Sequence, residues 1–214
     1  MIIIGMLDSP FVRRVAISAD WLGLAFEHQS LSVFSTFEEF QSINPQVKAP
    51  TVVLDSGLQL MDSSLILDYA ETMAPQSRSL MSTDPMQRAL DLHILGVALA
   101  VAEKTVQLVY ERNLRPVTKQ HDPWLHRVTG QLQAGCRRLN MLCQDRAGLL
   151  TEATLTQAWL TTAVVWRCMQ ELVPEQISAQ RFPALQQLSA EAESLPVFQR
   201  YPPTGPGVVA PAES

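Results

Sequence analysis

Strand-type patterns are confined to the first third of this chain, and that constrains its fold more than any other feature. Branched aliphatic runs or apolar alternation predict strands over 1–6, 26–33, 51–54 and 59–61, with a tight turn at Gly57 between the last two. Helical spacing falls between them, over 9–22, over 37–43 and from 63 onward. This order of elements predicts an α/β layer built on a mixed four-stranded sheet.

The composition changes after residue 73. Residues 74–85 hold two prolines and four serines or threonines, which is typical of a linker. Beyond it the pattern is helical, with apolar stripes over 86–113, 123–145, 156–172 and 183–193. The third stripe is apolar nearly all round, as expected of a buried central helix. After Tyr201 the chain has four prolines and two glycines, and we expect a loosely held tail.

Composition and charge narrow the function classes. With 47% hydrophobic residues, 17% charged residues and a net charge of −5, the chain suits a globular protein with a large core. The acidic balance argues against nucleic acid or an anionic membrane surface as a partner. The richest apolar run, Ile94–Ala102, is shorter than the roughly 18 residues of a membrane helix. Asp8 and Arg13 interrupt the apolar start, so we expect no signal peptide.

Three cysteines, Cys136, Cys143 and Cys168, lie in helical stretches. Their number is odd and no pair has CxxC spacing, so the sequence predicts neither a disulfide framework nor a metal site. Buried free thiols and a cytoplasmic location are the expectation.

The strand-to-helix junction at Asp8-Ser9-Pro10 is the first candidate site. Ser is a good N-cap and Pro is favoured at the first helical position, so Ser9 places a hydroxyl at a helix N-terminus. Such an end carries unpaired N–H groups and positive dipole charge, and it stabilises an anion. The alternative is that Ser9 only caps the helix.

Four segments together resemble the glutathione S-transferase family, in particular bacterial members with a serine-type N-terminal motif. They are SPFVRRV at 9–15, NPQVKAP at 44–50, LMDSSLI at 60–66 and TQAW at 156–159. The resemblance implies a thioredoxin-like glutathione-binding domain over 1–76, a linker over 77–85, an all-helical bundle over 86–200 and a tail over 201–214. The expected class is therefore α/β plus all-α.

The resemblance also implies roles for residues. Ser9 would be catalytic, donating to the glutathione thiolate, since a hydroxyl and a helix N-terminus lower a thiol pKa. Glutathione itself would contact Phe11, Lys48, Ala49, cis-Pro50, Asp62 and Ser63. A second-substrate pocket would draw on Leu7, Phe34, Gln107 and Tyr110. The alternatives are an ordinary turn proline at Pro50, plain helix capping at Asp62-Ser63 and a solvated surface Lys48.

The sequence departs from the family pattern at one place. Trp159 stands where the family usually has aspartate in the cap of its buried helix, and Thr154 with Gln157 offers a replacement capping box. Some members carry cysteine at the position of Ser9 and act on disulfides; serine here argues against that chemistry.

The leading interpretation is a transferase that joins glutathione, as co-substrate, to a small hydrophobic electrophile without a metal. The alternatives are glutathione-dependent peroxide reduction or another reductase activity, and a non-catalytic partner-binding or regulatory protein. The resemblance further implies a homodimer.

Overall fold

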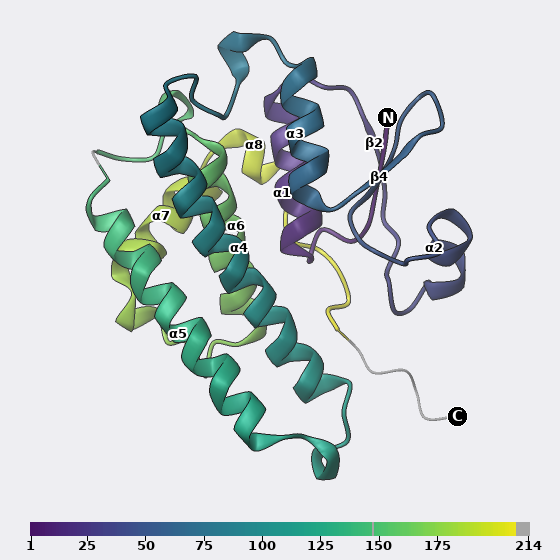
Figure 1. Ribbon diagram of the computed structural model, residues 1–214, viewed down its shortest axis with the longest axis vertical. Helices are drawn as coiled ribbons and strands as arrows, with labels where there is room; N and C mark the ends of the chain where they lie inside the picture. Colours follow the sequence, from purple (N-terminus) through teal and green to yellow (C-terminus); the bar gives the residue numbers. More distant parts are fainter. Residues whose placement is uncertain (147, 209–214) are drawn as a thin grey trace. The chain divides into compact units, whose positions relative to one another are not determined.

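The computed structural model describes residues 1–146 and 148–208, and the chain divides into two units (Figure 1). The first unit combines Met1–Met81 with Pro196–Pro206, and the second begins at Ser82 and runs to Leu195. We predicted 196–200 as part of the helical domain and the following residues as a loose tail. The segment up to Pro206 returns instead to the first unit, where buried Phe198 lies against the Arg13 guanidinium and the ring of Tyr201 packs against Phe26.

The first unit is built on a mixed four-stranded sheet, as predicted. Its strands are β1 (Ile2–Ile4), β2 (Glu27–Gln29), β3 (Thr51–Val53) and β4 (Gln59–Met61), in the order β2-β1-β3-β4. β1 pairs parallel with β2 and antiparallel with β3, and β3 pairs antiparallel with β4. The second strand is shorter than the predicted 26–33, because the Ser32 hydroxyl accepts from the N–H groups of Phe34 and Ser35 and forms a local turn instead.

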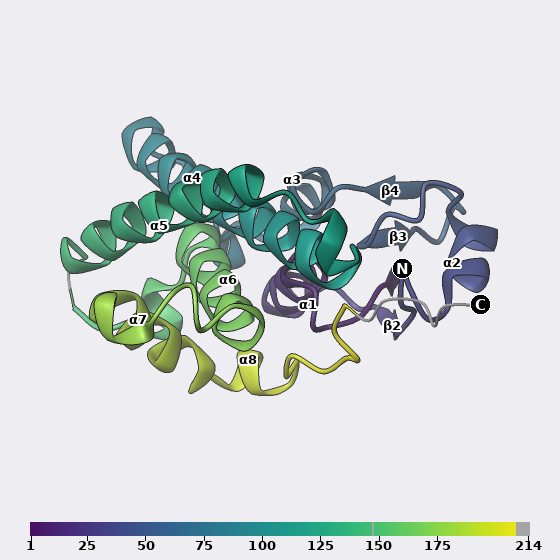
Figure 2. The ribbon, with the colours of Figure 1, turned by 90° about the horizontal axis from the view of Figure 1, so that it is seen from below.

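Helices cover both faces of this sheet. They are α1 (Pro10–Trp21), α2 (Phe37–Ile43) and α3 (Ser63–Met73), and the short α8 (Pro196–Gln199) contacts α1. Figure 2 shows the strands between α1 and α3 on one side and α2 on the other. Ile3 shares an apolar cluster with α1 and α3, whereas Ile4 packs with Phe40 of α2. The alternation of a strand therefore divides neighbouring residues between two cores.

The second unit is helical. Its main helices are α4 (Pro85–Asn113), α5 (Asp122–Gln144), α6 (Gln157–Leu172) and α7 (Pro183–Glu193). Short 3-10 turns lie outside them: Gln76–Arg78 in the first unit and Val117–Lys119, Glu152–Thr154 and Ala179–Arg181 in the second. α6 is buried along most of its length and contacts α4 and α7. All three cysteines are free and buried, as predicted.

The cap of α6 differs from the predicted one. Thr156 is the N-cap, and its hydroxyl accepts from the N–H of Trp159 at 3.4 Å. Thr154 instead closes a capping box with Thr151 around the preceding 3-10 turn. The predicted Thr154–Gln157 box is wrong because Thr154 already serves this upstream turn.

Helix α4 is long and apolar enough to cross a membrane by length and composition alone. Of its most apolar 18-residue window 44% is buried within the structure, and the helix packs on α5 and α6. Core helices of this kind meet the same criterion.

Candidate functional site

The N-terminal end of α1 presents a hydroxyl that the helix does not use. Ser9 is the N-cap residue by position, with φ −73° and ψ 123°, and its carbonyl accepts from the N–H of Arg13 at 2.9 Å. The predicted N-cap position is confirmed, but the Ser9 side chain makes no capping hydrogen bond, which does not favour the alternative that Ser9 only caps the helix. Because Pro10 contributes no N–H, the first turn has one donor fewer to satisfy. Both the hydroxyl and the helix end remain able to meet an anion.

Close packing at Gly5 brings the turn before β3 next to α1. A Cβ placed on Gly5 would lie 2.6 Å from Cγ2 of Val12 and 3.1 Å from Cβ of Ala49, and the φ of +139° also favours glycine. The Ala49–Pro50 peptide bond is cis, as the resemblance implied. Ala49 and the start of α1 thus belong to one site.

A buried amide holds the loop that carries Lys48 and Ala49. Asn44, 2% exposed, donates from Nδ2 to Thr51 Oγ1 at 2.7 Å and accepts at Oδ1 from the N–H of Gln46. Thr51 Oγ1 in turn donates to the carbonyl of Lys48 at 2.7 Å. Among the residues that the structure describes, no hydrogen bond involves the backbone of Ala49. Its N–H and C=O are therefore available for an extended peptide.

The start of α3 forms a charged corner of the site, made of Asp62 and Lys48. Asp62 has φ +72°, and its Oδ1 accepts from the N–H of Ser64 at 2.9 Å. Its other oxygen, Oδ2, lies 3.8 Å from Nζ of exposed Lys48. Asp62 is thus both an N-cap and an exposed carboxylate, so a plain capping role accounts for only one of its oxygens.

Arg14 lies beneath this corner and was missed from the sequence. Its side chain is 1% exposed, and Nη1 donates to Ser63 Oγ at 2.9 Å and to Ser64 Oγ at 3.3 Å. Burial lowers the pKa of Arg14 to about 10, while the charge of Asp62 acts in the opposite direction. The guanidinium therefore stays protonated at neutral pH, and it adds positive charge below the N-terminus of α3.

The remaining predicted residues occupy different surroundings. Phe11 is half-buried on the first turn of α1, and Phe34 is half-buried on the loop before α2. Leu7 is 8% exposed and belongs to the apolar cluster under α1. Gln107 and Tyr110 lie on α4 in the second unit; Gln107 accepts from Lys104 Nζ, and burial raises the pKa of Tyr110. Their part in a second-substrate pocket stays a prediction.

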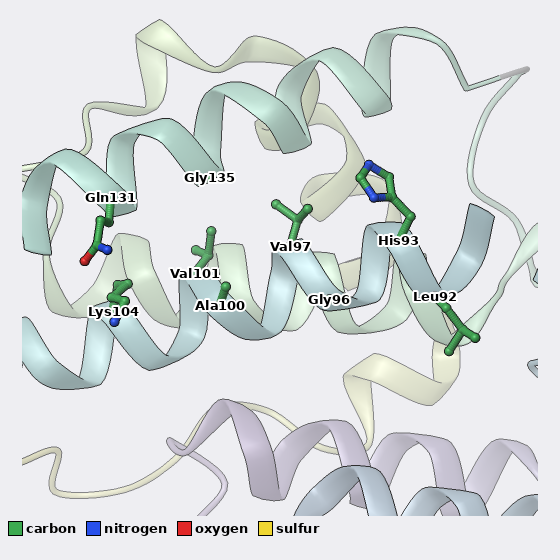
Figure 3. A pocket seen from close by; sticks show the side chains of 9 residues that line it. All are labelled: Leu92, His93, Gly96, Val97, Ala100, Val101, Lys104, Gln131 and Gly135. Atoms are coloured by element: carbon green, nitrogen blue, oxygen red, sulfur yellow. The ribbon is translucent and has the colours of Figure 1, made fainter. Parts of the chain in front are cut away.

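The second unit has a hollow of its own between α4 and α5. It measures about 490 Å³, and Figure 3 shows Val97, Ala100 and Val101 along it with His93 and Lys104 at separate points. A Cβ on Gly96 would meet nothing within 4 Å, so the missing side chain leaves this space open. Among the described residues, no group of three or more His, Cys, Asp or Glu side chains is placed to hold a metal ion.

Comparisons with known proteins relate the first unit to a described family. Residues 3–78 match the family model described as glutathione S-transferase, N-terminal domain. The first unit therefore carries a glutathione S-transferase N-terminal domain. A curated relative, the uncharacterized GST-like protein YibF of Escherichia coli, is 26% identical over 167 residues, which cover 77% of each chain.

Solved structures share the whole fold. A glutathione S-transferase from Methylobacterium radiotolerans, in complex with glutathione sulfonate, has a TM-score of 0.88 at 24% identity and covers 99% of each chain. Another, from Methylobacillus flagellatus with glutathione bound, has a TM-score of 0.84 at 21% identity over 95% of this chain and 99% of its own. These likenesses confirm the predicted class, a thioredoxin-like N-terminal domain and a helical C-terminal domain.

Proposed function

We propose that this protein is a transferase that binds glutathione in its N-terminal unit and joins the glutathione thiolate, through its sulfur, to a small hydrophobic electrophile. The observation that carries the proposal is the uncommitted Ser9 hydroxyl at the N-terminus of α1, on a chain whose structural relatives bind glutathione or its sulfonate. The free backbone of Ala49 and the charged corner at Asp62 supply the other contacts that a tripeptide needs.

Each part of glutathione meets a chemically suited group. The cysteinyl unit pairs its backbone with the N–H and C=O of Ala49, as an added strand does. The γ-glutamyl carboxylate takes the N–H and hydroxyl of Ser63 at the N-terminus of α3, and its ammonium group takes Asp62. The glycine carboxylate lies toward Lys48. The ring of Phe11 borders the sulfur from the first turn of α1.

Ser9 acts on the sulfur and attacks nothing itself. Its hydroxyl donates a hydrogen bond to the thiolate, and the dipole of α1 adds positive potential, so the thiol loses its proton to water near neutral pH. The sulfur lone pair then forms a bond to the electrophilic carbon. With an aromatic chloride, the carbon–chlorine bond breaks and its electron pair leaves as chloride.

Binding and turnover are tested separately. We expect calorimetric titration to show glutathione binding to the wild type, and Ser9→Ala to retain it. Conjugation of glutathione to chlorodinitrobenzene below the thiol pKa should fall about tenfold to a hundredfold in Ser9→Ala, because a bond to a charged group contributes about 1.5–3 kcal/mol. Ser42→Ala, which alters an exposed serine on α2, is the matched control and should leave the rate unchanged.

Other outcomes favour the alternatives. Equal rates in Ser9→Ala and wild type would remove Ser9 from the mechanism. Binding without conjugation, but with peroxide reduction, would favour the reductase; binding with neither activity would favour a regulatory protein. Absence of binding would contradict the proposal altogether.

We also propose that the protein is a homodimer in the cytoplasm. Leu65, Tyr69 and Met73 recur every four residues on α3 and are 65%, 37% and 53% exposed. An apolar stripe of this kind favours coverage by another protein surface. Sedimentation at the monomer mass of 23.8 kDa would contradict the dimer.

A further inference from the structure

The segment after α8 returns to the helix that carries Ser9. Figure 1 shows it, in yellow, running from α8 alongside α1. Arg13, 1% exposed, donates from Nε to the carbonyl of Tyr201 at 2.7 Å, and its guanidinium carbon lies 5.7 Å from the ring centre of Phe198. The Tyr201 ring packs against Phe26, with centroids 5.8 Å apart. One end of the segment is therefore fixed on α1 and the sheet.

The other end lies against the residue that precedes Ser9. The N–H of Asp8 donates to the carbonyl of Thr204 at 3.2 Å. A Cβ placed on Gly205 would overlap the carboxylate of Asp8 and lie 2.9 Å from Asp8 Cβ. Only glycine leaves room for this contact. If the Asp8 carboxylate turned away, a Cβ on residue 205 would still lie too close to the Cβ of Asp8.

We propose that Tyr201–Gly205 forms a strap that holds the N-terminal end of α1, and that Arg13 and Gly205 are positioning residues for Ser9. The proposal rests on the proposed role of Ser9 and names what sets its geometry. The two anchors bracket Ser9, since Asp8 directly precedes it and Arg13 follows one turn later. Release of either anchor lets the first turn shift relative to Ala49.

This arrangement separates positioning from binding. Apart from Phe11, which borders the sulfur, the groups proposed to hold glutathione lie at Lys48–Ala49 and Asp62–Ser63, on elements that the strap does not touch through the contacts above. A displacement of about 1 Å at a reacting group lowers rates as much as a hundredfold, whereas binding through distant contacts persists. Loosening the strap should therefore affect the thiolate much more than the affinity for glutathione.

The test is Gly205→Ala in the full chain, with Gly130→Ala as the matched control. A Cβ on Gly130 meets nothing within 4 Å on exposed α5, so the control adds the same methyl group harmlessly. Arg13→Lys is a second variant that keeps the charge and removes the Nε donor. The readouts are amide hydrogen exchange at Asp8, the glutathione Kd, and the pKa of bound glutathione from the ultraviolet absorbance of its thiolate.

In both variants we expect faster amide exchange at Asp8 and a raised pKa of the bound thiol. At a pH below that pKa, conjugation should be slower by about tenfold to a hundredfold, while the Kd for glutathione stays within about twofold of the wild-type value. Gly130→Ala should match the wild type throughout. Faster exchange with an unchanged thiol pKa would overturn the strap's positioning role and leave the proposed function intact. A wild type that does not bind glutathione would overturn both.

Discussion

The close approach at Gly5 gives the sharpest test of how the site is built. Gly5→Ala places a methyl group 2.6 Å from Val12 Cγ2 and 3.1 Å from Ala49 Cβ, on a backbone with φ +139°. The first distance is shorter than real Cβ contacts allow, so β1, α1 or the turn at Ala49 has to move. All three border the proposed glutathione site.

The expected cost has two parts. Holding alanine in a sparsely populated region of φ costs about 1–3 kcal/mol, and overpacking against Val12 and Ala49 costs about 1–3 kcal/mol more. Gly5→Ala should therefore lose about 2–6 kcal/mol of unfolding free energy. Gly57→Ala is the matched control, because its φ is +82° but its Cβ would meet nothing within 4 Å. It should lose about 1–2 kcal/mol.

Urea denaturation of these variants measures the free energies. Adding Val12→Ala to Gly5→Ala removes the atom nearest the new methyl group. The double variant should therefore lose less unfolding free energy than the two single variants together, by about 1 kcal/mol or more. Strict additivity, or equal losses in Gly5→Ala and Gly57→Ala, would refute the steric argument. The glutathione affinity of Gly5→Ala should fall as well, because Ala49 is displaced.

Two further changes probe buried charge. Arg14→Met removes the guanidinium bonds to Ser63 and Ser64 below α3, so the calorimetric Kd for glutathione should rise about tenfold to a hundredfold; an unchanged Kd would mean that Arg14 only fills space. Burial raises the pKa of Asp91, which is 1% exposed and accepts from Gln87 Nε2. The folded protein thus binds this proton more tightly than the unfolded chain, so stability falls as pH rises from the unfolded pKa to the raised folded pKa and stays lowered above it. Asp91→Asn should therefore raise Tm more at pH 7 than at pH 4, and an equal change at both would contradict this.

Most of the fold could be predicted because its local signals agree with its packing. Branched aliphatic runs or apolar alternation located every strand, and the helix over 183–193 was predicted with the observed bounds. The strand over 26–33 was too long, because a side chain–backbone turn at Ser32 competed with the ladder. A local sequence pattern does not show which of these two hydrogen-bonding arrangements is the more stable.

The candidate site was predicted less completely. The motif around Ser9 located the right junction, but a cap is assigned from residue type, whereas the hydrogen bond depends on side-chain orientation. Arg14 was missed because arginine is rarely buried, and its partners lie some 50 positions further along the chain. The strap was missed because a stretch rich in proline and glycine carries no periodic pattern to indicate what it packs against.

The strap also makes the first unit discontinuous in sequence, which matters while the chain is being synthesised. Met1–Met81 leaves the ribosome first, but Pro196–Pro206 is made more than a hundred residues later. At about 5–20 residues per second, the segment that anchors α1 follows by roughly 6–25 s. Throughout that interval the buried guanidinium of Arg13 lacks the Tyr201 carbonyl. The first unit can therefore be completed only after Pro206 has been made.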